Sequence, residues 1–229
     1  MFSKKDSVPP IPLTPLKRRN PLVELSTDLE ELLDSDVVLS THSHFDHFDQ
    51  EAADHLDKSI HIIHQEEDEK FMRKHGFESL FPIKDKITYE GIKITRIEAQ
   101  HGHGITAKLM GPASGYVLQS DNEPTVYIAG DTVYNSTVKS TIESYQPEYI
   151  ILNGGSPKFL MSDPIVMTIM DIEKTISVKP DSHFIVVHLD TMNHCIETRE
   201  DLLEYFTPEK KSELKVTHLH LPMDNETLL

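Results

Sequence analysis

The stretch that decides the fold is LSTHSHFDHFDQ, from Leu39 to Gln50, in which three histidines and two aspartates follow an apolar run. The residues leading into it, Asp36–Ser40 (DVVLS), have the length and the β-branched composition of a buried strand. The histidine cluster is therefore predicted to stand at the C-terminal end of a strand. Two explanations compete: a metal centre, or a polar turn whose aspartates cap a helix.

The spacing of this cluster suits two metal ions. Successive residues of an extended chain point to opposite sides, so His42 and His44 can face one ion. Asp46 and His47 follow after the chain has begun to turn and can reach a neighbouring ion. Imidazole and carboxylate ligands suit zinc, iron and manganese, and the absence of nearby thiols argues against a structural zinc site. In the alternative explanation, Asp46 or Asp49 caps a helix and the histidines are solvated.

Three further residues of ligand type stand at the ends of apolar, strand-like stretches. His101 ends RIEAQ, Asp131 ends TVYIAG and His188 ends HFIVV. Each one alone is ordinary, because a histidine at a strand end is commonly a surface residue and Gly-Asp is a common turn pair. A site for two metals needs more donors, on strand ends at the same edge of the sheets. The three coincidences together favour the metal centre.

Length and composition favour one domain. The 229 residues, 38% of them hydrophobic, can bury one sizeable core. We expect a Pro-rich N-terminal arm over residues 1–21 and one domain over residues 22–229. The single cysteine, Cys195, excludes an internal disulfide, and the N-terminal residues lack the apolar region of a signal peptide, which predicts a cytoplasmic protein. The net charge of −16 argues against nucleic acid as a partner, and the lack of a long apolar run argues against a membrane.

The remaining sequence predicts a mixture of helices and strands. Capping-box patterns at Thr27 with Glu30 and at Thr168 with Asp171 each predict the start of a helix. Two antiparallel hairpins are expected, over residues 86–100 and 115–131. Strand-rich and helix-rich stretches in one chain indicate an α/β (α+β) fold with sheets packed between helices. Further strands are expected at 60–64, 148–153 and 183–188, and further helices at 50–57, 66–77, 136–145 and 198–206.

The motifs THSHFDH, QHGHG, YIAGDT and VVHLDTMNHC together resemble the successive motifs of the metallo-β-lactamase superfamily. The last two are most similar to the branch that contains ascorbate-phosphate lactonase and N-acyl-phosphatidylethanolamine-hydrolysing phospholipase D. The resemblance spans about Pro21 to the C-terminus and implies a four-layer αββα sandwich with metals at one edge of its two sheets. By position it implies a first metal bound by His42, His44 and His101, a second bound by Asp46, His47 and His188, and Asp131 bridging them.

The sequence departs from the family pattern at its beginning. Members normally start with a strand pair ahead of the Pro-rich segment, and here Met1 falls where that pair should already have ended. The fold is therefore expected to lack the usual first strands, which would leave unpaired backbone and uncovered apolar surface. A misassigned start codon, a deliberate truncation, or completion by another subunit would each explain the departure.

The resemblance implies a dinuclear metal-dependent hydrolase. Nitrogen and oxygen ligation of this kind suits zinc or manganese as the two divalent ions. A metal-bound hydroxide would attack a carbonyl or phosphoryl centre while Asp46 orients it. His194 is the candidate that donates a proton to the leaving group or contacts substrate, with an ordinary loop histidine as the alternative. Two divalent ions with Asp46, Asp131 and a bridging hydroxide would leave about one net positive charge, so the small-molecule substrate is expected to be attracted through an anionic group.

The substrate bond and the reaction class stay open at this point. The resemblance allows a lactone, ester, amide, thioester or phosphodiester. A di-iron redox or oxygen-reducing protein of the same fold is one alternative, although that branch typically carries Glu where His44 stands here. A non-catalytic, truncated family member is another. A homo-oligomer is compatible with everything in the sequence.

Overall fold

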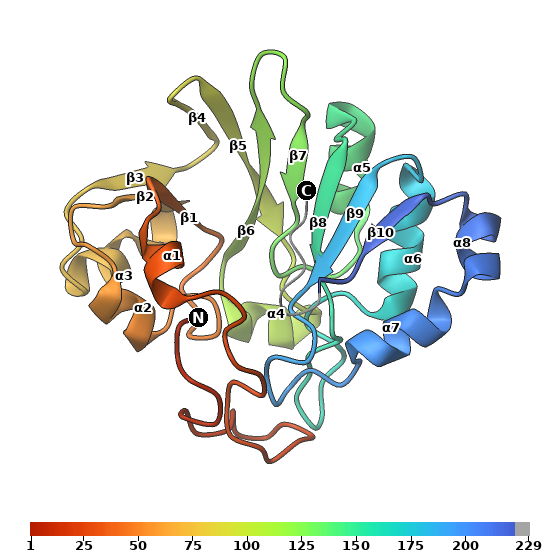
Figure 1. Cartoon of the computed structure of the whole chain (residues 1–229), viewed down its shortest axis with the longest axis horizontal. Coiled ribbons are helices and arrows are strands. Elements are labelled where there is room, and N and C mark those ends of the chain that lie inside the picture. Colours follow the sequence, from red (N-terminus) through yellow and green to blue (C-terminus); the bar gives the residue numbers. More distant parts are fainter. Residues whose placement is uncertain (223–229) are drawn as a thin grey trace.

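The structure, a computed structural model, describes residues 1–222 and contains two β-sheets that face each other (Figure 1). The small sheet has the strand order β1-β2-β3, and the large sheet has the order β10-β9-β8-β7-β6-β5-β4. The strands are β1 (Val37–Ser40), β2 (His61–Gln65), β3 (Leu80–Ile83), β4 (Lys86–Tyr89), β5 (Ile92–Ala99), β6 (Ala113–Gln119), β7 (Val126–Ile128), β8 (Tyr149–Asn153), β9 (His183–Val187) and β10 (His218–His220). The helices are α1 (Leu29–Leu33), α2 (Gln50–His55), the 3-10 helix η1 (Glu66–Asp68), α3 (Glu69–Lys74), α4 (Gly104–Met110), α5 (Ser136–Tyr145), α6 (Ile169–Val178), α7 (Arg199–Tyr205) and α8 (Pro208–Leu214).

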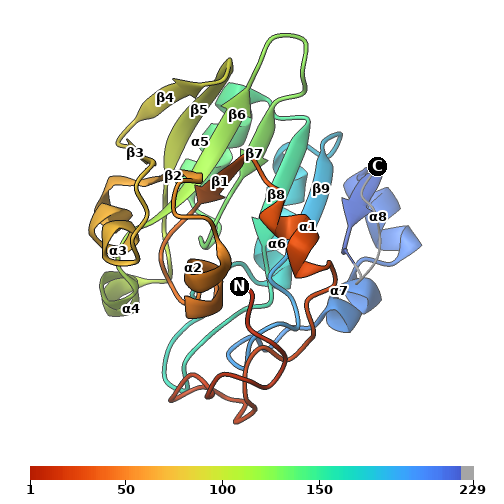
Figure 2. The ribbon, with the colours of Figure 1, turned by 60° about the vertical axis from the view of Figure 1, so that its left-hand side comes forward.

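Helices cover the outer face of each sheet, so the molecule has four layers (Figures 1 and 2). Apolar residues of α2 and α3, such as Ala53 and Met72, pack on Ile62 of the small sheet. On the other side, α5 and α6 pack on the large sheet, where Phe184 is fully buried. A third cluster lies between the sheets and includes Tyr116. The predicted αββα sandwich is therefore confirmed.

The predicted hairpins are confirmed. Strands β4 and β5 pair antiparallel, as do β6 and β7, whereas β7, β8, β9 and β10 pair parallel. The capping box of Thr168 with Asp171 starts α6 as expected. The one at Thr27 is wrong, because α1 follows Asp28 and no side chain caps it. Sequence reasoning missed β3, α4, α8 and β10, and α4 lies within a glycine-bounded stretch that reads as a loop.

The N-terminal arm, residues 1–21, contains no named strand, and its only backbone pairing of strand type is an isolated antiparallel bridge between Val8 and Asn20. A buried side chain from the far end of the chain holds the arm: Asn193 accepts a hydrogen bond from the backbone N–H of Ile11 (3.0 Å) and donates to its carbonyl (3.1 Å). The arm therefore packs against the loop after β9, at the end of the sandwich where α4 also lies (Figure 1).

A groove of about 490 Å³ runs between the two sheets. One wall is β1, which is an edge strand of the small sheet, and the other is the inner face of β7, β8 and β9. Its apolar lining includes Leu39, Ile128, Ile151 and Val187, and its inner end reaches Asp46, His47 and His188. Within residues 1–222, no helix combines the length and apolar character needed to cross a bilayer.

Candidate metal centre

The candidate site lies at one end of the sandwich, where several loops leave the strands. The loop after β1 carries His42 to Asp49, and Tyr116 of β6 fixes the start of this loop by donating its hydroxyl hydrogen to the carbonyl of Ser40 at 3.0 Å. His101 follows β5 and His188 follows β9. Sheet pairing therefore brings these loops to one edge, as the strand-end argument predicts.

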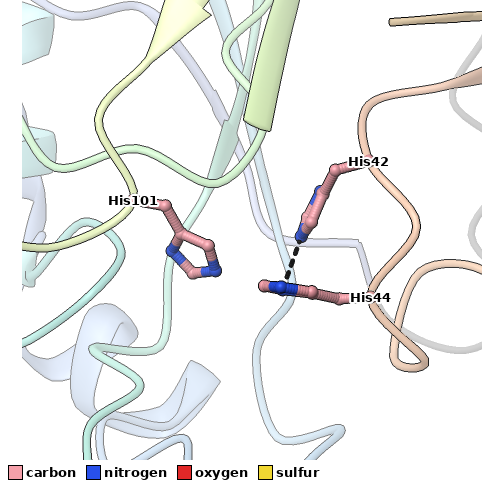
Figure 3. A group of neighbouring side chains, drawn as sticks. All are labelled: His42, His44 and His101. Atoms are coloured by element: carbon pink, nitrogen blue, oxygen red, sulfur yellow. Dashed lines mark hydrogen bonds between the residues drawn. The ribbon is translucent and has the colours of Figure 1, made fainter. Parts of the chain in front are cut away.

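Three histidines form the first cluster (Figure 3), and each offers one nitrogen within 4.8 Å of the others. Nε2 of His42 lies 3.0 Å from Nδ1 of His44. On its other side, His44 places Nε2 2.9 Å from the carbonyl of Met110, while His101 places Nδ1 2.9 Å from the carbonyl of Ile165. A carbonyl can only accept, so these nitrogens carry the protons. Nδ1 of His44 and Nε2 of His101 are left with lone pairs, as metal ligation requires.

Asp131 lies beside this cluster and forms a second one with His42 and His47. It follows β7, is 1% exposed, and groups with His42 and His47. Its Oδ2 lies 3.2 Å from Nε2 of His47, 3.5 Å from Nε2 of His101 and 3.8 Å from Nε2 of His42. Its Oδ1 accepts a hydrogen bond of 2.6 Å from Asn153, the last residue of β8. Sequence reasoning missed Asn153, although a polar residue that ends an apolar strand was the same signal used for its neighbours.

A third group contains Asp46, His188 and His194. Oδ2 of Asp46 lies 3.6 Å from Nε2 of both histidines. The ring of His47 stacks on that of His188, with 5.3 Å between the centroids. All seven predicted ligands thus gather in one place, and His194 joins them. The grouping differs from expectation in one respect: His194, expected to donate a proton or contact substrate, is the third member beside Asp46 and His188, while His47 stands with His42 and Asp131.

The turn explanation holds for one aspartate only. Asp49 caps α2 by accepting a hydrogen bond from the backbone N–H of Ala52, and it also accepts one from the Ser3 hydroxyl. Asp46 instead faces the histidines, and His42 is 1% exposed, not solvated. In this loop, Asp49 therefore caps helix α2, whereas Asp46 belongs to the candidate metal centre.

The electrostatics of the site suit metal ions. Burial, assisted by the charge of His47, lowers the pKa of His42 well below its ordinary value, and burial lowers the pKa of His194 to about 4. Burial acts in the opposite sense on Asp131, but the charges of His47 and His188 outweigh it and hold the pKa of this carboxyl well below its usual range. Neutral His42 and His194 beside ionised Asp131 are in the protonation states that metal ligands need. Burial acts to lower the pKa of His188, but the charge of Asp131 helps to raise it well above its ordinary value, so this imidazole would give up a proton when an ion binds.

Two buried nitrogens provide a second test of whether these residues can hold metal ions. Within residues 1–222, Nε2 of His188 and Nδ1 of His194 have no hydrogen-bond partner. Leaving such a group unpaired costs about 1–3 kcal/mol each, and structures tolerate this where an ion or a catalytic role compensates. The donor set therefore fits divalent metal ions held by nitrogen and oxygen.

The loop after β9 is strained where it aims His188 into the centre. His188 has φ +67° and Asp190 has φ +55°, a left-handed conformation that costs a side-chain-bearing residue about 1–2 kcal/mol. Anchors on both sides hold it: the N–H of Gly154 donates to the carbonyl of Val187 at 2.9 Å, and the N–H of Arg199 donates to the Asp190 carboxylate at 2.8 Å. Nothing in the local sequence signals this conformation.

Comparisons with known proteins agree with this architecture. The model of the family described as "Beta-lactamase superfamily domain" matches residues 12–189. The chain is 36% identical over 194 residues to the UPF0173 protein YddR of Bacillus subtilis, covering 83% of this chain and 76% of that protein.

Two solved structures are also similar. One is a possible metal-dependent hydrolase from Veillonella parvula, with a TM-score of 0.92 and 31% identity over 98% of this chain and 88% of the other. The second is an isothiocyanate hydrolase from Delia radicum gut bacteria, with a TM-score of 0.93 and 30% identity over 100% of this chain and 90% of the other. The chain therefore belongs to the β-lactamase superfamily and, within it, to the UPF0173 family of metal-dependent hydrolases with the metallo-β-lactamase fold.

Proposed function

We propose that this centre binds two divalent ions, zinc or manganese, and that the protein hydrolyses a small molecule at an electrophilic carbon, with an isothiocyanate as the first candidate. The observation that carries the proposal is the convergence of histidines and two ionised carboxylates from separate loops on one buried point. The first ion would take His42, His44 and His101, and the second would take Asp46 and His188 with His47 or His194, while Asp131 lies between them.

Divalent ions in such a site lower the pKa of a bound water to about 7 and polarise the oxygen or sulfur of a substrate. The carboxylate of Asp46 would orient the attacking water by accepting its hydrogen bond. Burial raises the pKa of this carboxyl, but the imidazole of His188, 3.6 Å away, and the charge of His47 lower it further, so Asp46 is ionised at neutral pH. It is therefore ready to accept a hydrogen bond without first losing a proton.

His194 would act mainly by position. With its pKa lowered to about 4 by burial, it carries a single ring proton at neutral pH. A neutral imidazole is a weak acid, so this favours a role as ligand or hydrogen-bond donor over a role as the source of the leaving group's proton. The ring lies 3.6 Å from Asp46 and can restrict where that carboxylate points.

The substrate class rests on the similarity to the isothiocyanate hydrolase. In such a reaction the oxygen of water adds to the central carbon of R–N=C=S, the carbon–nitrogen bond breaks, and both water protons end on nitrogen, giving R–NH2 and COS. No charged leaving group has to be expelled. The resemblance to ascorbate-phosphate lactonase and the phospholipase D branch supports lactones and phosphodiesters as further substrates to compare.

The test is a panel assay on the purified protein, stripped of metal and reloaded with zinc, manganese or iron. We expect zinc or manganese to restore hydrolysis of an aralkyl isothiocyanate, measured as amine release, ahead of a lactone, a nitrophenyl ester and a phosphodiester. Hydrolysis of another class alone would replace the substrate and keep the metal chemistry. Full activity of metal-free protein would contradict the proposal, and His55→Ala on the exposed face of α2 provides the control.

A further inference from the structure

A second group of histidines lies away from this centre, on the edge of the large sheet. His183 begins β9, and His218 and His220 stand on the parallel edge strand β10, where His218 pairs in register with His183. Each of the three offers one nitrogen within 4.8 Å of the others. Residues two apart on a strand share a face, so the register places all three side chains on the same side of the sheet.

The three rings form a stack of nearly parallel planes, so the exposed rings of His218 and His220 have to turn for their nitrogens to converge on one ion. The rings of His183 and His218 are 7° from parallel with their centroids 3.8 Å apart, and those of His218 and His220 are 13° from parallel at 6.4 Å. Tyr149, the partner of His183 in β8, stacks on the opposite face of that ring at 4.8 Å and limits its rotation. His218 and His220 are exposed, so an ion from solution can reach them.

Among residues 1–222, the cluster consists of imidazoles without a paired carboxylate. Within the described part of the chain, none of the three histidines has a hydrogen bond or ion pair to a carboxylate, and nearby Asp181 is paired with Lys179 at 2.9 Å. Partial burial, with the neighbouring charges of His218 and His220, lowers the pKa of His183. Adjacent neutral imidazoles are the donors preferred by zinc, nickel and copper, and they suit hard ions such as magnesium poorly.

This cluster is separate from the hydrolytic centre. His183 and His188 stand at opposite ends of β9, about 16 Å apart along an extended strand. The hydrolytic centre is buried and contains two carboxylates, whereas the edge cluster is exposed and contains only imidazoles. We therefore expect it to bind an ion without activating a buried nucleophile.

We propose that His183, His218 and His220 form a surface site for a borderline transition-metal ion, zinc, nickel or copper, which fastens the edge strand β10 to β9. The site goes beyond the proposed hydrolytic function and does not depend on it. Strand β10 has three residues and, among residues 1–222, pairs only with β9, so a metal bridge to β9 adds a restraint that its few backbone hydrogen bonds do not provide. Binding to the folded state alone then stabilises this edge by mass action.

The test compares the wild-type protein with His218→Ala/His220→Ala and with the control His55→Ala, each titrated with nickel and with copper. We expect the wild type and the control to bind one more ion per chain than the double variant, whose affinity at this site falls at least about 100-fold. Copper bound at this site should show hyperfine coupling to imidazole nitrogen. Hydrolytic activity should be the same in all three proteins.

Hydrogen exchange adds a readout that hydrolysis does not share. Metal should slow exchange of the β10 amides in the wild type and leave the double variant unchanged. The single variants His218→Ala and His220→Ala guard against misfolding, and each should show intermediate affinity with an unchanged thermal unfolding curve without metal. Equal stoichiometry in the wild type and the double variant would overturn the proposal, even if the hydrolytic centre binds its ions as described.

Discussion

Strand β9 has a histidine cluster at each end, and the two clusters differ in almost every physical respect. At its C-terminal end, His188 enters a buried group with two carboxylates, held by loops with strained backbone. At its N-terminal end, His183 joins an exposed group of imidazoles on regular paired strands. If the proposals above hold, the comparison would teach that histidines in proximity are enough to bind an ion, whereas hydrolysis also needs burial and anions. Low dielectric strengthens each charge interaction, and loops can place residues where strand register cannot.

The largest loss of activity and metal content is expected from removing the charge of Asp131 in the buried cluster. Asp131→Asn retains the shape of the side chain but removes the charge that faces His42, His47 and His101. We expect hydrolytic activity and metal content at this centre to fall together by at least about 100-fold. The matched change at the exposed cluster, His218→Ala/His220→Ala, should leave activity intact. Normal turnover by Asp131→Asn would contradict the claim that hydrolysis depends on the buried cluster and not on the exposed one.

A smaller change is expected from removing the hydrogen bonds that connect the loop after β9 to the N-terminal arm. Asn193 is fully buried and hydrogen-bonds Ile11, Thr14, Leu16 and Asn20 of the N-terminal arm. Asn193→Ala leaves several backbone groups unpaired and should lower the free energy of unfolding by about 3 kcal/mol, measured by denaturant titration.

The same variant should weaken metal binding at the buried centre, because the loop carrying His188 and His194 loses the side-chain hydrogen bonds of Asn193 to the arm. Metal binding at the exposed cluster should not change, because among the described residues His183, His218 and His220 form no hydrogen bond with residues 1–21. A loss of affinity at both clusters would show that the two ends of β9 are not independent.

Acid should destabilise the metal-free protein through the protonation of His194 in the unfolded state. His194 has an ordinary pKa of 6.5 when unfolded and about 4 when folded, so below pH 6.5 the unfolded state binds a proton that the folded state excludes. Stability contributed by this group is therefore present above pH 6.5 and lost as the pH falls toward 4. Between pH 7.5 and pH 5 the loss for the metal-free protein should be about 2 kcal/mol. His194→Asn, which does not titrate, should unfold with a correspondingly smaller pH dependence.

The smallest effect is expected at the exposed end. Tyr149 stacks on His183 with 4.8 Å between centroids. Tyr149→Ala should cost about 0.5 kcal/mol of stability, the size of an exposed cross-strand pair, and leave hydrolysis unchanged. Thermal unfolding and the isothiocyanate assay measure both quantities. A destabilisation as large as that of Asn193→Ala would mean that this end is more tightly packed than its exposure indicates.

The two ends also differ in how far sequence predicts them. The strand before His42 and the polar residues after β5, β7 and β9 are local patterns, and they identified all seven residues that gather at the buried end. The place of His194 beside Asp46 was not predictable, because it follows from the left-handed backbone at His188 and from contacts between loop and arm.

The exposed cluster was missed altogether for a related reason. Strand β10 has three residues, HLH, which is too short for its alternation to predict a strand from the sequence alone. Its histidines meet His183 only through the register of a parallel pair distant in sequence. Non-local pairing of this kind leaves no trace in a local pattern.

The central claim, that the buried cluster is a metal centre, is tested most directly by anomalous diffraction at the zinc edge from crystals grown with zinc. We predict a peak at about 2.0–2.1 Å from one nitrogen each of His42, His44 and His101, with a second peak beside Asp46 and His188. Diffraction from zinc-grown crystals with no anomalous peak among these residues, and with their side chains turned apart, would contradict the account.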